Sequence, residues 1–78
     1  MIRHSEITDI ELRKQIRQHK IFFAGNAKLK IYGKLDCKSG KRMKRDNRVF
    51  FHSKKEAINQ GFRPCGHCMK KDYEKWKN

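Results

Sequence analysis

The sequence is poor in acidic residues and has no long apolar run. Only 8 of its 78 residues are Asp or Glu, against 21 Lys or Arg, which leaves a formal net charge of +13. This charge excludes the role of an acidic interaction tail and favours a polyanionic partner, nucleic acid first and an anionic membrane surface a distant second. The chain has neither a secretory signal nor the roughly 18 to 20 apolar residues of a membrane span. We therefore expect a cytoplasmic protein without a membrane partner.

The chain also has little material for a hydrophobic core. Hydrophobic residues make up 36% of it and charged residues 37%, and the mean hydropathy is −1.05. A domain of this size usually needs a disulfide, a metal or a partner to be stable. Because the sequence has only 3 cysteines, they cannot all pair, and a cytosolic chain keeps them reduced. We expect a bound metal rather than a disulfide framework.

Local signals predict a single domain, residues 1–78, that begins with a helical segment over residues 1–20. Thr8 and Glu11 have the spacing of a capping box, which opens a helix from about residue 9 to 18. Ile7 precedes the cap and is placed to pack against Leu12 as a hydrophobic staple.

A hairpin and a third strand are expected next, within a core of residues 21–68. Apolar residues at 21–24 and alternating residues at 28–32 flank Gly25-Asn26, a dipeptide typical of tight hairpin turns. The alternation predicts an apolar face and a basic face that ends in an aromatic ring. Val49-Phe50-Phe51 is expected to form the third strand.

The second half of the chain predicts two more helices. Ser53 and Glu56 form a second capping box, and Gly61 is placed to end that short helix. After a knuckle, residues 69–78 form a C-terminal helix whose apolar stripe, at helical spacing, is expected to pack on the core. The predicted fold is therefore α+β: an N-terminal helix, a three-stranded antiparallel sheet, a short helix, a CxxC knuckle and a C-terminal helix.

The cysteines indicate a zinc site. Cys65 and Cys68 have the two-residue spacing of a zinc knuckle, and Cys37 lies upstream just after a predicted strand. Alternatively, Cys37 is a buried apolar residue and the CxxC is a redox pair. A thioredoxin-like motif needs a βαβ context that this chain is too short to provide, so we favour Zn2+ on Cys37, Cys65 and Cys68. A structural zinc site contributes on the order of 10 kcal/mol to folding.

Four segments in order carry a resemblance to a known family: Arg45-Asp46-Asn47, the pair Phe50-Phe51, the Ser-x-x-Glu-Ala helix at 53–57, and Gly-Phe-Arg-Pro-Cys-x-x-Cys at 61–68. The run from residue 21 to 68 resembles the N-terminal metal-binding domain of the Ada DNA-repair proteins. The resemblance implies a zinc domain that contacts DNA and transfers a methyl group from a DNA phosphotriester onto one of four zinc-bound cysteines.

The sequence departs from this family pattern at one position. The family motif Ile-aromatic-Cys-x-x-x-Cys corresponds here to residues 31–37, so Cys37 matches the second cysteine and Gly33 stands at the first, the methyl acceptor of the family. A glycine has no sulfur with which to attack a methyl group. The fourth zinc ligand is left open between solvent or an added N-terminal histidine on one side and His52 or His67 on the other.

The segment after Cys37 is a strongly basic loop. A run of charge is usually only a solvated surface, but this one adjoins the predicted metal site, and the resemblance implies that it touches DNA backbone. We expect phosphate contacts, which neutralise charge without reading sequence. Tyr32 is a candidate for stacking on a base. The predicted DNA-binding residues are Lys38, Lys41, Arg42, Lys44, Arg45, Arg48 and Arg63.

These observations favour a small, monomeric zinc-containing DNA-binding module of the Ada type, in DNA repair or its regulation, without the usual methyl acceptor. One alternative is an enzyme on DNA, which either accepts methyl groups through another cysteine or hydrolyses phosphoesters at an open zinc position. A second alternative is a structural zinc protein that binds RNA or a protein partner. We rank enzyme activity below binding.

Overall fold

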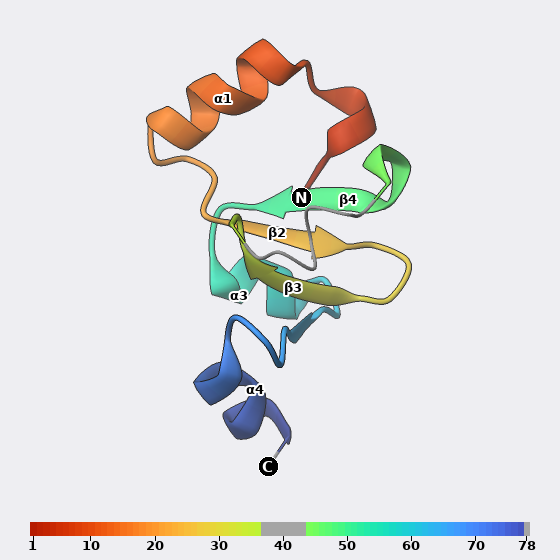
Figure 1. Cartoon of the computed structure of the whole chain (residues 1–78), viewed down its shortest axis with the longest axis vertical. Helices are drawn as coiled ribbons and strands as arrows, with labels where there is room; N and C mark the ends of the chain where they lie inside the picture. The colour runs from red at the N-terminus through yellow and green to blue at the C-terminus, as the bar shows by residue number, and fades with distance from the viewer. Residues whose placement is uncertain (37–43, 78) are drawn as a thin grey trace.

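The computed structural model of the chain describes residues 1–36 and 44–77. Within these residues, one five-stranded sheet with the order β1-β4-β2-β3-β5 forms the centre, and three α-helices surround it (Figure 1). No described helix meets the length and apolarity needed to cross a membrane. The strands are β1 (Ile2–Arg3), β2 (Phe23–Asn26), β3 (Ile31–Lys34), β4 (Arg48–Phe51) and β5 (Arg63–Pro64), and the helices are α1 (Asp9–Arg17), α3 (Lys54–Asn59) and α4 (Lys70–Lys77).

The sheet confirms the predicted α+β class and extends it at both edges. Strands β3, β2 and β4 pair antiparallel, as the three-stranded prediction requires. The short strand β1 adds antiparallel to β4 at one edge, and β5 adds parallel to β3 at the other. Neither two-residue strand has enough sequence to show the alternation that identifies a strand. The parallel pair places residue 64 beside residue 32, which fixes the position of the knuckle that follows.

The helix α1 packs on one face of the sheet through Leu12. Its predicted cap is present, because the Thr8 hydroxyl accepts a hydrogen bond of 3.2 Å from the Glu11 amide. The two staple residues are both buried, and they join a cluster with residues of β2, β4 and the segment that leads into β2. That cluster consists of Ile7, Leu12, Ile21, Ala24 and Phe50. Burial of apolar side chains in this cluster, rather than helix propensity, stabilises so short a helix.

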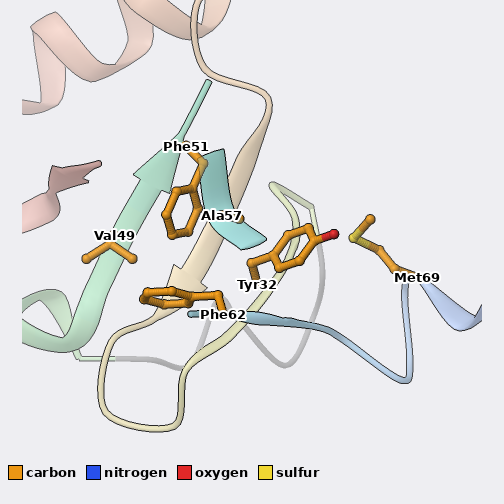
Figure 2. Close-up of a cluster of buried hydrophobic side chains, with 6 residues drawn as sticks. All are labelled: Tyr32, Val49, Phe51, Ala57, Phe62 and Met69. Carbon is orange, nitrogen blue, oxygen red and sulfur yellow. The ribbon is translucent and has the colours of Figure 1, made fainter. Parts of the chain in front are cut away.

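A second cluster lies on the opposite face, under α3 (Figure 2). The Phe51 ring meets Phe62 edge-on at 4.8 Å and Tyr32 at 6.4 Å between centroids, and each such pair adds about 0.5–1.5 kcal/mol beyond its buried area. Tyr32 is only 1% exposed. It is a core residue, so the expectation that it stacks on a nucleic-acid base is wrong. The full cluster is Tyr32, Val49, Phe51, Ala57, Phe62 and Met69.

The hairpin turn lies later in the chain than predicted. Gly25 and Asn26 belong to β2, and the turn consists of residues 27–30. The Asn26 carboxamide oxygen accepts hydrogen bonds from the amides of Lys28, at 2.9 Å, and Leu29, at 3.1 Å, so a side chain organises the turn. Gly25 serves packing instead, because a Cβ there would lie 3.0 Å from both the Ile31 carbonyl oxygen and the Phe51 ring.

The second helix has the predicted limits. The Ser53 hydroxyl accepts a hydrogen bond of 3.1 Å from the Glu56 amide, and Gly61 follows the helix with a φ of +85°. Such a left-handed backbone conformation favours glycine and ends the helix there. The stripe on α4 behaves differently from the prediction. Met69, just before the helix, is buried, but Trp76 is 52% exposed.

Arg45 ties the chain that enters β4 to the N-terminal segment. Its guanidinium donates to the carbonyl oxygens of His4, at 3.2 Å, and Ile7, at 2.9 Å, and lies 3.4 Å from the Asp9 carboxylate. Charged donors to carbonyl groups contribute about 1.5–3 kcal/mol when shielded from water. The Arg45 side chain is 48% exposed, so its contribution is at the lower end of this range.

We expect Arg45→Met to lower the free energy of unfolding by about 1–2 kcal/mol, because two carbonyl groups lose a charged donor. Urea unfolding of the zinc-loaded protein, followed by far-UV circular dichroism, measures the change. Lys44→Met removes the neighbouring exposed cation and should leave the midpoint nearly unchanged. Equal midpoints for the two variants would show that Arg45 does not anchor the N-terminal segment.

Candidate metal centre and adjoining groove

The knuckle lies against the end of β3 because β5 is paired in parallel to that strand. Tyr32 stands opposite Pro64, so Gly33 and Cys65 come next to each other along the two strands. The Cys65 amide donates a hydrogen bond of 2.7 Å to the Tyr32 carbonyl oxygen. The predicted pair of sulfurs is therefore held next to the sheet, although residues 66–68 themselves form a turn.

Backbone amides face the two sulfurs. The Lys34 amide lies 3.3 Å from Cys68 Sγ and the His67 amide 3.4 Å from Cys65 Sγ. Such N–H groups stabilise negative charge on sulfur, and it is the thiolate that binds a metal. Cys65 is 8% exposed and Cys68 is half-buried. This donor arrangement fits a soft divalent ion such as Zn2+.

Gly33 faces the same two cysteines. A Cβ at this position would lie 2.7 Å from Cys68 Sγ and 3.1 Å from Cys65 Cβ. A side chain here would therefore point at the sulfurs, and position 33 belongs to the candidate centre although it contributes no donor. The sequence signal was the glycine itself, at a place where the family pattern has cysteine.

The remaining predicted ligands are not gathered around this pair. No third His, Cys, Asp or Glu within residues 1–36 and 44–77 forms a metal-binding group with the two cysteines. The ring of His52 makes a hydrogen bond of 2.5 Å to the Lys20 carbonyl oxygen. His67 is exposed on the knuckle. Cys37 lies outside the described residues.

The predicted phosphate contacts are dispersed. Lys38, Lys41 and Arg42 lie outside the described residues, and Lys44 is exposed. Arg45 is engaged with the N-terminal segment, as described above. Arg48 lies over the Phe50 ring at 5.2 Å, and burial lowers the pKa of its guanidinium. In the sheet order, β2 and β3 separate Arg48 from Arg63.

A groove of about 400 Å³ adjoins the cysteines. Its walls come from the hairpin (Leu29, Ile31), the knuckle (His67) and α4 (Tyr73). Arg63 also lines the groove, and its guanidinium lies 5.3 Å from the Tyr73 ring and 5.9 Å from the Trp76 ring. The sequence predicted a phosphate contact for Arg63 but not these aromatic neighbours. The stripe at residues 69, 73 and 76 was the available signal, and it was interpreted as core.

Comparison with known proteins gives one result. A family model described as the metal binding domain of Ada matches residues 8–71, which is most of the chain. No curated protein and no solved structure gives a significant match. The match includes β2 to β5, the knuckle and the position of Cys37.

We expect Gly33→Ala to weaken Zn2+ binding about tenfold or more, because the added methyl group overlaps Cys68 Sγ and overpacking costs about 1–3 kcal/mol. Gly66→Ala is the matched control, since its Cβ would meet the Tyr73 ring at an ordinary 3.7 Å. Competition with a chromophoric chelator measures both affinities. Equal affinities for the two variants would contradict the placement of Gly33 at the metal centre.

Proposed function

The chain belongs to the family of Ada metal-binding domains, and from this premise we propose that it is a zinc-containing DNA-binding module that contacts the phosphate backbone in DNA repair or its regulation. Zn2+ is the cofactor that the family implies. The observation that carries the proposal is the pair of sulfurs held by backbone amides against Gly33. The net charge of +13 supports a polyanionic partner.

Cys65 and Cys68 would hold the ion, with Cys37 as the third thiolate. The described pair supplies two of the donors that a structural zinc site needs. Cys37 is assigned from the sequence, since it follows Gly33 by four residues, the spacing of the two cysteines in the family motif. Bound there, the ion would supply a cross-link between β3 and the knuckle, which compensates for the small core.

Gly33 determines what the module does not do. Methyl transfer by the route that the family resemblance implies needs a thiolate at this position, and glycine provides none. The fourth coordination position is therefore assigned to solvent, because the His52 ring is bound to the Lys20 carbonyl oxygen and residues 65–68 direct His67 outward. In this proposal the module binds DNA and does not accept methyl groups through residue 33.

Phosphate contacts come from cations that the fold does not use internally. Lys34 is exposed at the end of β3 and lines the groove beside the cysteines. Lys38, Lys41 and Arg42 are assigned as phosphate contacts from the sequence alone, and Lys44 is exposed. Arg45 and Arg48 have structural contacts and contribute less. Lys and Arg on phosphate oxygens position a protein on DNA without selecting a sequence.

We expect the protein to bind one Zn2+ and to lose it in Cys37→Ser, Cys65→Ser and Cys68→Ser, because each variant removes one of three thiolates. His52→Ala and His67→Ala should retain the ion. Metal content by mass spectrometry of dialysed protein gives the stoichiometry, and circular dichroism reports the fold. A wild-type protein that folds without zinc would overturn the proposal, and loss of zinc in either histidine variant would reassign the fourth ligand.

We also expect DNA affinity to fall linearly with the logarithm of salt concentration, with a slope of about 0.9 for each phosphate contact on a duplex and about 0.7 on a single strand. Arg42→Gln should reduce the magnitude of that slope by about one, whereas Arg13→Gln, which removes an exposed arginine on α1, should leave it unchanged. Fluorescence anisotropy of a labelled oligonucleotide at several salt concentrations measures both slopes. A slope near zero for the wild type would exclude backbone recognition.

A further inference from the structure

The groove beside the cysteines has the dimensions and surface of a ligand site. Its volume of about 400 Å³ lies within the range of about 300–1,000 Å³ that small-molecule sites occupy. Gly33 and Gly66 are among its lining residues. Leu29, which borders it, is 62% exposed. A chain with so small a core leaves these apolar groups uncovered.

Two lining residues of this groove, Arg63 and Tyr73, belong to an aromatic and guanidinium stack that Trp76 extends. The rings of Tyr73 and Trp76 lie 6.0 Å apart with an interplanar angle of 26°, and the Arg63 guanidinium lies over both. A hydrogen bond of 3.1 Å from Arg63 to the Pro64 carbonyl oxygen fixes its orientation. Because Trp76 remains 52% exposed, core packing does not account for the stack. Flat aromatic and guanidinium surfaces of this kind bind nucleic-acid bases by stacking.

The charge of the groove selects an anionic ligand. Lys34, Arg63 and His67 line it, and no Asp or Glu occurs among its described lining residues. Nearby Asp72 is paired with Lys54 at 3.2 Å. A ligand that fits must present a flat apolar face to Tyr73 and negative charge to the cations at the rim. A nucleotide combines these two properties.

We propose that this groove receives an unpaired nucleobase, and that the module therefore binds single-stranded DNA in preference to duplex. The inference rests on the proposed DNA-binding function and adds its substrate class. In a duplex the bases are paired and stacked on one another, so none is available to enter the groove without an unpairing cost of a few kcal/mol. Backbone contacts alone would give no such preference.

The single tryptophan of the chain provides the probe. Zinc-loaded full-length protein is titrated with an oligothymidylate, with an abasic strand of the same number of phosphates, and with a duplex of the same length. We expect the oligothymidylate to quench Trp76 fluorescence and to bind about tenfold tighter than the abasic strand, since stacking contributes about 1–3 kcal/mol per base. The duplex should bind more weakly than the oligothymidylate.

Three variants test whether base recognition occurs in the groove. Tyr73→Ala should remove most of the preference for bases over abasic sites, measured as the ratio of the two affinities in the same variant. Trp76→Leu alters only an exposed ring and provides a second test if the first variant misfolds; anisotropy of a labelled strand replaces the lost fluorescence. Phe22→Ala is the matched control, because it removes an aromatic ring, 49% exposed, from outside the groove.

The outcomes separate the two proposals. Equal affinities for the oligothymidylate and the abasic strand would overturn base recognition and leave backbone binding intact. A preference for duplex would also overturn the inference. Failure to bind any of the three DNA molecules would contradict the proposed function and the base site together. If Phe22→Ala lost the base preference to the same extent as Tyr73→Ala, the base would not bind in the groove and the inference would be overturned.

Discussion

The parallel pairing of β5 with β3 is the contact on which the site depends. It places Cys65 beside Gly33 and brings the Lys34 amide to Cys68 Sγ, 34 residues apart in sequence. It also positions Arg63, and through it the aromatic rings of α4, at the edge of the same groove. The short pairing of β5 with β3 contributes little stability by itself. The sheet is small, and its two hydrophobic clusters share few residues with the knuckle. In the proposed function, a metal bound at this point would stabilise the strand pairing and the site together.

The cationic side chains of this chain fall into two groups, one with contacts inside the fold and one that lines the groove. Arg45 and Arg48 support the fold, the first by hydrogen bonds to carbonyl oxygens of the N-terminal segment and the second by lying over the Phe50 ring. Lys34 and Arg63 line the groove and remain directed towards a ligand. Part of the net charge of +13 is therefore used within the fold. The distribution favours a small contact surface around the metal centre over a basic surface that surrounds the molecule.

The parts of the structure that the sequence predicted well depend on neighbouring residues. Both capping boxes are present at Thr8 and Ser53 because a cap and its amide partner are three residues apart. The turn was misplaced because the Asn26 side chain, rather than Gly25-Asn26 as a turn, organises the hairpin. Three features depend on residues that are distant in sequence: the short edge strands, the burial of Tyr32 and the Arg63 stack. No local sequence pattern could therefore predict them. For the metal centre, the spacing of Cys65 and Cys68 was sufficient to predict the knuckle, whereas the contact with Gly33 required the fold.

We propose that three thiolates and one solvent position surround the zinc, because Gly33 supplies no sulfur. X-ray absorption at the zinc edge measures this directly, since Zn–S distances of about 2.3 Å are distinct from Zn–O and Zn–N distances of about 2.0–2.2 Å. We expect three sulfur ligands and one oxygen. Four sulfur ligands, or two sulfurs with two histidine nitrogens, would contradict it.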